Sequence, residues 1–172
     1  MQEIELNVKY DLESINEAHI KEVIKEFIRS LQSFFGKNLV SIILFGSIAR
    51  GDFSENSDID ILVVAKNFPK SFSKRIDLFI PIVEKARRKA PNYPFIQVYP
   101  LTVNEALKNR PIYLDLITDA IILYDEGNFM MNILNKLFKK LKKLGAKKIY
   151  LENGSWIWIL KPSIKIGEVV EL

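Results

Sequence analysis

Two short apolar segments, residues 39–45 and 59–65, constrain the fold of this 172-residue chain more than any other feature. Both are rich in β-branched residues and both end at turn formers, which is the pattern of buried strands. Only about a dozen residues separate them, whereas a parallel pair needs a crossover of at least that length, usually containing a helix. We therefore expect the two strands to pair within a mixed sheet, unlike the doubly wound nucleotide-binding folds.

The rest of the chain alternates between helical and strand-like patterns. Residues 13–35 carry apolar side chains at three- and four-residue spacing, with Ser14 as a candidate N-cap and Gly36 as a C-cap. By the same reasoning we expect helices at 71–89, 103–108, 111–118 and 129–144, and strands at 93–101, 120–124, 148–151 and 156–160. The fold class that follows is α/β (α+β), a mixed sheet with flanking helices and a C-terminal helix-strand extension.

Composition excludes several kinds of site. The chain has no cysteine and one histidine, which rules out disulfides, thiolate metal sites, cysteine nucleophiles and any site built on two histidines. Hydrophobic residues make up 48% and charged residues 27%, as in globular proteins. No apolar run reaches the roughly 20 residues that span a bilayer, and the first residues are acidic. These features predict a soluble, cytoplasmic protein with no membrane association.

The second strand opens with two aspartates that can act together. Asp58 and Asp60 are two residues apart, so on a strand they project from the same face, with backbones about 6–7 Å apart. Two carboxylates at that spacing repel each other unless a cation relieves them, and oxygen ligands of this kind suit Mg²⁺. A solvated strand end is the plain alternative. We expect Asp58 and Asp60 to hold a metal ion.

The first strand ends in a turn suited to phosphate. Gly46 permits a sharp turn and a close approach of the backbone, and Ser47 adds a hydroxyl and an N–H group. Arg50 can neutralise a phosphate oxygen as a two-pronged donor. Ser57 lies at the other end of the ten-residue loop and is a further candidate for binding the nucleotide.

The combination of these features is far more specific than either part. A Gly-Ser pair followed after ten residues by Asp-x-Asp resembles the signature of the DNA polymerase β-like nucleotidyltransferases, particularly the minimal nucleotidyltransferase (MNT) type. It is similar to the antitoxins of HEPN/MNT toxin–antitoxin pairs. The signature covers residues 44–64, and the arrangement of helices and strands extends the likeness to about residue 101.

The resemblance implies an activity and a set of binding partners. In such a protein Asp58 and Asp60 bind Mg²⁺, and Gly46, Ser47, Arg50 and Ser57 hold a nucleoside triphosphate. A nucleoside monophosphate, by analogy AMP from ATP, is transferred to a hydroxyl group, which in antitoxin members belongs to a tyrosine of the HEPN-type toxin partner. We expect residues 1–125 to form the nucleotidyltransferase domain and 126–172 to be an extension packed on it.

One part of the family pattern is missing. Relatives that transfer nucleotides usually have a third carboxylate on a neighbouring strand, but residues 93–101 contain none and place Gln97 in the expected region. An amide cannot act as a general base at neutral pH. Either Asp77 or Asp115 substitutes from elsewhere, or the strand is aligned wrongly, or the activity is reduced to nucleotide binding.

Two C-terminal features leave a second function open. Residues 136–148 contain seven lysines and no acid, which fits either a solvated helix face or a surface for nucleic acid. Trp156 and Trp158 alternate and should share one strand face, within a core or against a partner. The alternative to catalysis is therefore a weakened nucleotide-binding antitoxin, or a nucleic-acid-binding module, that acts by contact. The sequence does not indicate the oligomeric state.

Overall fold

The computed structural model describes residues 4–54, 56–91, 95–165 and 167–170. Its helices are α1 (Ala18–Phe35), α2 (Gly46–Arg50), α3 (Phe72–Arg87), α4 (Val103–Ala106), α5 (Ile112–Asp119) and α6 (Phe129–Leu144). Its strands are β1 (Leu39–Phe45), β2 (Ile59–Ala65), β3 (Ile96–Thr102), β4 (Ile121–Asp125), β5 (Lys147–Tyr150) and β6 (Trp156–Ile159). Short 3₁₀ turns, η1 (Gly36–Asn38) and η2 (Glu126–Asn128), precede β1 and α6.

The main sheet has four strands in the order β3-β2-β1-β4. Strand β1 runs antiparallel to β2 and to β4, whereas β2 and β3 are parallel and joined through α3. The sheet is thus mixed, and the expected pairing of the first two strands is confirmed. Both strands have the predicted bounds, because their apolar runs end at residues that turn the chain.

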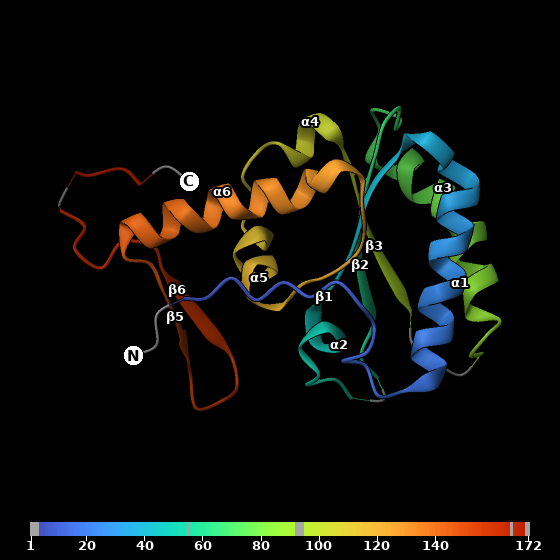
Figure 1. The fold of residues 1–172 in the computed structure, drawn as a ribbon, viewed down its shortest axis with the longest axis horizontal. Coiled ribbons are helices and arrows are strands. Elements are labelled where there is room, and N and C mark those ends of the chain that lie inside the picture. Colours follow the sequence, from blue (N-terminus) through green and yellow to red (C-terminus); the bar gives the residue numbers. More distant parts are fainter. Residues whose placement is uncertain (1–3, 55, 92–94, 166, 171–172) are drawn as a thin grey trace.

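Helices cover both faces of the sheet, as Figure 1 shows with the sheet seen nearly edge-on. Alternation along β2 decides which face each side chain joins. Ile59, Ile61 and Val63 pack with α1 and α3, whereas Leu62 and Val64 pack with α5 and α6. The aspartate face of β2 therefore belongs to the side covered by α5 and α6.

Helix α1 begins later than its apolar pattern predicts. It starts at Ala18, and the residue before it, Glu17, is extended and makes no side-chain cap. The expected cap at Ser14 is wrong, since the chain reaches the core at Ile15, which is 1% exposed, before the helix begins. Gly36 does end the helix, as expected, in a positive-φ conformation. The predicted strand at 93–101 begins at Ile96, and residues 93 and 94 lie outside the described residues.

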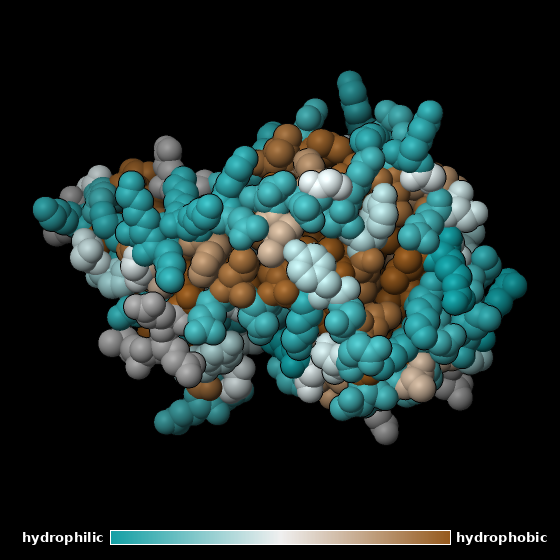
Figure 2. Space-filling view, in the orientation of Figure 1, coloured by the Kyte–Doolittle hydropathy of each residue, from teal (hydrophilic) through white to brown (hydrophobic). Residues whose placement is uncertain are grey.

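The last segment of the chain packs beside the main sheet. Helix α6 buries Met130, Leu134, Leu137 and Leu141 against it, and Gly145 ends the helix with positive φ. Its outward face is hydrophilic (Figure 2). Strands β5 and β6 then form a separate antiparallel hairpin next to α5 (Figure 1). Among the described residues, no helix is long and apolar enough to cross a membrane.

Candidate active site

The two aspartates lie at the beginning of β2, beside both neighbouring strands. Asp58 directly precedes the strand, and Asp60 is paired with Phe45 of β1 on one side and Gln97 of β3 on the other. Asp60 is half-buried. This burial raises the pKa of its carboxyl group, the negative charge of Asp58 raises it further, and Arg50 opposes the shift. Ionised Asp60 is therefore held at a cost in free energy, which a bound cation would relieve.

The turn after β1 faces the Asp60 carboxylate directly. Gly46 has φ +76°, a conformation that L side chains rarely adopt. A Cβ atom at this position would lie 2.3 Å from Asp60 Oδ2, closer than atoms can approach. Glycine is thus required both by the backbone angle and by the contact. The structure brings together the two halves of the signature, with the carboxylate pressed against the bare backbone of the turn.

Arg50 has one partner close in sequence and one far along the chain. Its Nε donates to Asp52 Oδ2 at 3.0 Å, and its guanidinium lies 4.7 Å from the centroid of the Trp156 ring. The Trp156 indole N–H in turn donates to Asp115 Oδ1 at 2.8 Å. A cation over an indole face is an attractive arrangement. The hairpin of β5 and β6 therefore contacts Arg50, one of the residues expected to bind phosphate.

The hairpin itself is fixed to α5 by a polar and aromatic cluster. Trp158 also donates its N–H to Asp115, at 3.2 Å, and the two tryptophans share one face of β6 as expected. Lys148 bonds Asp119 at 2.7 Å and Thr118 at 2.8 Å, and its Nζ lies 4.5 Å from the Trp156 ring centroid. The Trp156 ring thus contacts two cations, one from the hairpin and one from α2.

The two serines of the candidate set are placed differently. Ser47 lies half-buried in α2, and its carbonyl accepts from the N–H groups of Gly51 and Asp52. The Ser57 hydroxyl accepts from the Ser54 N–H at 2.8 Å and so holds the loop closed before Asp58. Ser57 therefore shapes the approach to the aspartates, and its role toward a nucleotide stays a prediction.

Strand β3 carries the amide of Gln97 in the region where the family pattern predicts a third carboxylate. Gln97 is exposed, and its backbone pairs with that of Asp60 on the neighbouring strand. The Tyr99 hydroxyl lies 3.5 Å from Gln97 Oε1, and its ring packs 5.4 Å from that of Phe45. An exposed amide and an aromatic pair thus border the aspartates on this side.

Neither alternative acid is available in this structure. Asp77 lies exposed on α3, which covers the opposite face of the sheet, and Asp115 accepts from both indole N–H groups. No group of three or more histidine or acidic side chains suited to a metal occurs among the described residues. Among the residues that the structure describes, the acidic centre therefore consists of Asp58 and Asp60.

Sequence reasoning missed the contact between Arg50 and Trp156. The two residues are far apart along the chain, and no spacing rule links a strand of the C-terminal hairpin to a helix after β1. The alternation of Trp156 and Trp158 indicated a shared face, but not which cation that face would meet.

Comparison with known proteins identifies the class of protein in which a glycine turn meets a pair of strand aspartates in this way. A sequence profile described as "Nucleotidyltransferase domain" matches residues 24–113. The chain belongs to this nucleotidyltransferase family, which confirms the resemblance drawn from the signature. Members of the family generally use a divalent metal.

Individual relatives cover much of the chain. A Methanocaldococcus jannaschii protein named "Putative protein adenylyltransferase MJ1305" is 36% identical over 145 residues, covering 83% of this chain and 96% of its own. A second protein of that organism with the same name except for its number, MJ0141, is 34% identical over 89 residues, covering 52% of this chain and 84% of its own. A solved structure described as "Crystal structure of the toxin-antitoxin with AMP-PNP" aligns at 19% identity and a TM-score of 0.45, covering 69% and 90% of the two chains.

Proposed function

We propose that this nucleotidyltransferase transfers AMP from ATP, with Mg²⁺, to a hydroxyl group of another polypeptide. The observation that carries the proposal is the contact between Gly46 and the Asp60 carboxylate, since it brings the glycine turn and an acid suited to a metal into one place. The names of the Methanocaldococcus relatives support adenylyl transfer to protein as the form of the reaction.

The residues present fit a divalent cation. Asp58 and Asp60 offer hard oxygen donors, and the pKa of Asp60 is raised by burial and by the charge of Asp58, so a cation would stabilise its ionised form. When bound, Mg²⁺ would neutralise charge on the phosphates and on the two carboxylates. Arg50, Ser47 and the N–H groups of the turn after β1 would position the triphosphate, because they lie on the element that faces Asp60.

The reaction balances without any further reactant. The acceptor oxygen forms a bond to the α-phosphorus, the bond from that phosphorus to the bridging oxygen breaks, and pyrophosphate leaves with the electron pair. The acceptor proton passes to solvent, because the neighbouring strand presents the amide of Gln97 at this position and no carboxylate. We expect this arrangement to give a slower reaction than a site with a third acid.

The partner and the division of the chain complete the proposal. The acceptor is a helical toxin of the HEPN kind, as the resemblance to HEPN-paired antitoxins implies. Residues 1–125 supply the nucleotidyltransferase domain, and residues 126–172 form an extension on it. The burial of α6 against the main sheet and the contact of Trp156 with Arg50 support this division of roles.

Transfer of label from ATP tests the activity. The chain is incubated with Mg²⁺ and a HEPN-type toxin, using ATP labelled on the α-phosphate and, separately, on the γ-phosphate. The proposal expects covalent label on the toxin from the α-labelled nucleotide only, lost with Asp58→Asn or Asp60→Asn. Label from the γ-phosphate, or transfer that survives both substitutions, would contradict it.

A second candidate function rests on Gln97. Because an amide occupies the place of the third acid, the chain would act as a nucleotide-binding antitoxin by contact. In that case inhibition of the toxin survives Asp58→Asn and Asp60→Asn. A third option, binding of nucleic acid, is supported by the exposure of all five lysines of α6, namely Lys136, Lys139, Lys140, Lys142 and Lys143. It predicts RNA or DNA binding that weakens steeply with salt.

A further inference from the structure

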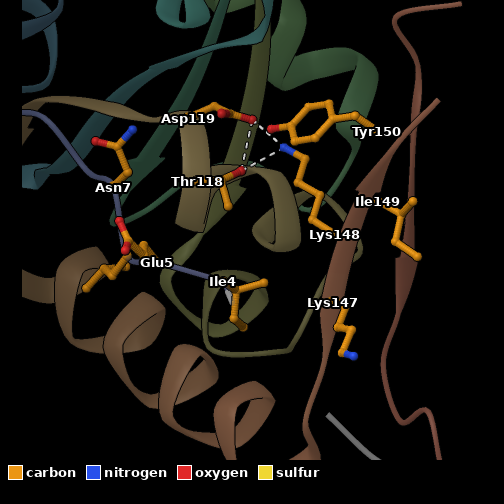
Figure 3. Close-up of a pocket in the computed structure, with 10 residues that line it drawn as sticks. Ile4, Glu5, Asn7, Thr118, Asp119, Lys147, Lys148, Ile149 and Tyr150 are labelled. Carbon is orange, nitrogen blue, oxygen red and sulfur yellow. Dashed lines mark hydrogen bonds and ion pairs between the residues drawn. The ribbon is translucent and has the colours of Figure 1, made fainter. Parts of the chain in front are cut away.

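A cleft of about 600 Å³ lies between the N-terminal segment and the hairpin. One wall consists of the consecutive residues 4–7 and the other of the consecutive residues of β5, and Thr118 and Asp119 of α5 line it as well. Figure 3 shows the two extended segments on opposite sides, with Lys148 reaching from β5 to Thr118 and Asp119. Two extended backbones therefore face each other across this space.

On β5 the backbone groups of alternate residues point toward the cleft side. The Leu151 N–H donates to the Ser155 carbonyl, which makes residues 149 and 157 the next hydrogen-bonded pair of the hairpin. Lys148 and Tyr150 then belong to the other pairs, so their backbone N–H and C=O groups point away from β6. Within the described residues, only β6 pairs with β5.

The N-terminal segment has the complementary arrangement. The Asn7 N–H donates to Ile117 O, the Lys9 N–H to Ala120 O, and the Lys9 carbonyl accepts from Ile122. These bonds lay the segment beside the end of α5 and the start of β4. In extended chain the neighbouring residues turn their backbone groups to the other side, so Leu6 and Val8 direct theirs away from β4.

The size of the cleft matches one added strand. Four residues of extended chain are about 13 Å long, and with strands about 4.8 Å apart and a layer about 10 Å thick they fill roughly 620 Å³. A strand in this position would connect the main sheet, through the N-terminal segment, to the hairpin. Lys148 lies along one side of the space, where its bonds to Thr118 and Asp119 keep it in place.

The cleft continues to the candidate active site. A second pocket of about 220 Å³ shares Asn7, Thr118, Asp119 and Tyr150 with it and adds Lys9, Ala49 and Arg50. Lys9 and Arg50 are the two cationic residues that line this second pocket, and Arg50 is one of the residues proposed to bind phosphate. A bound polypeptide that extends from this end of the cleft would therefore reach Lys9, Arg50 and α2.

We propose that the cleft binds one extended segment of the acceptor polypeptide by strand addition, with hydrogen bonds to both walls, and directs its hydroxyl residue toward Arg50. The proposal rests on the proposed function for the identity of the acceptor. Strand addition uses main-chain bonds for affinity and so accepts varied side chains, with selection by the pockets at alternate positions. The binding itself requires no nucleotide.

Peptide selection without ATP tests the proposal separately from the chemistry. Random octapeptides displayed on phage are selected on the whole wild-type chain, and one enriched peptide is synthesised. We expect it to slow hydrogen exchange at the backbone N–H of Tyr150 and of Leu6. Tyr150→Pro, which removes an N–H that β6 does not use, weakens binding about tenfold or more, whereas Tyr150→Ile keeps the N–H and leaves binding within about threefold.

A scan of the peptide avoids any question about the folding of the variant. N-methylation at each interior residue in turn weakens binding at both odd and even positions if the strand is bonded on both sides, but at alternate positions only if it adds to one edge. Three results overturn the proposal. The first is that no peptide binds the wild type better than the Tyr150→Pro variant, and the second is that N-methylation weakens binding at alternate positions only. The third is that the chain forms a dimer that Tyr150→Pro dissociates. Loss of label transfer alone would contradict the proposed function and leave peptide binding intact.

Discussion

Two acidic groups in this molecule, Asp60 in β2 and Glu105 in α4, have opposite electrostatic surroundings. Glu105 follows β3 and receives two bonds from the buried Arg75, at 2.5 and 3.1 Å, together with the N–H and hydroxyl of Thr102. Those hydrogen bonds, chiefly from Arg75, lower the pKa of Glu105 to about 2. The pKa of Asp60 is instead raised by burial and by Asp58.

We infer that the difference separates a charge that stabilises the fold from a charge that serves the proposed site. Glu105 completes a capping box at the start of α4 and neutralises a side chain that is 5% exposed, so its contacts stabilise the fold. Asp60 receives no such bonds from described residues, and its nearest opposing charge, Arg50, is itself paired with Asp52. An acid whose ionised form is disfavoured in this way is what we expect in a site that binds a cation.

Removal of the Asp60 charge should have the largest effect. Asp60→Asn, or Asp58→Asn, should lower AMP transfer by about 10³-fold, since electrostatic groups at reacting centres contribute on this scale. The melting temperature should stay the same or rise, because an unfavourable charge is lost. Asp77→Asn, an exposed acid on α3, is the matched control. A large fall in melting temperature with unchanged transfer would reverse the assigned roles.

Removal of the Glu105 charge should have the opposite profile. Glu105→Gln leaves Arg75 buried without its counter-ion and should lower the free energy of unfolding by about 1–3 kcal/mol. This loss is smaller than that expected for a fully buried ion pair, because the Glu105 side chain is partly exposed. Transfer should change by less than about threefold after correction for the folded fraction. Denaturant unfolding and label transfer measure the two effects. A loss of transfer in the fully folded variant would place Glu105 in the site.

The hairpin contact offers an intermediate effect. Trp156→Ala removes the ring that lies against Arg50, a contact that contributes about 0.5–2 kcal/mol, and should raise the KM for ATP about 2- to 30-fold with little change in kcat. Trp156→Phe should restore part of the loss. Ile157→Ala, on the other face of β6, is the control. Equal effects of the two alanine variants would show that only the stability of the hairpin matters.

Acid titration should give the smallest effect and the clearest sign. The pKa of Glu105 is lowered in the folded state, so its stabilisation is complete above the ordinary value of 4.5 and is lost as the pH falls toward about 2. The pKa of Asp60 is raised, so its protonation favours the folded state as the pH falls. Unfolding of Glu105→Gln should therefore depend less on pH between 4.5 and 2 than that of the wild type. An unchanged slope would remove Glu105 from this role.

Much of the sheet could be predicted because its signals are local. The bounds of β1, β2 and α6 follow from apolar runs that end at turn residues, and the family pattern predicted that Gln97 lies on a strand next to the aspartates. The start of α1 could not be predicted, since Ile15 is buried by tertiary contacts and not by the helix pattern. In the candidate site, local spacing predicted the two aspartates, but the contact of Trp156 with Arg50 could not be predicted, because it depends on tertiary packing.

The central claim is that Asp58 and Asp60 bind the nucleotide through a divalent cation. Calorimetric titration with an ATP analogue that cannot be cleaved between the α- and β-phosphates, with and without Mg²⁺, tests it on the wild type, Asp60→Asn and Glu105→Gln. The account predicts binding that requires Mg²⁺ in the wild type and in folded Glu105→Gln, and none in Asp60→Asn. Equal affinity in all three, or affinity independent of Mg²⁺, would contradict it.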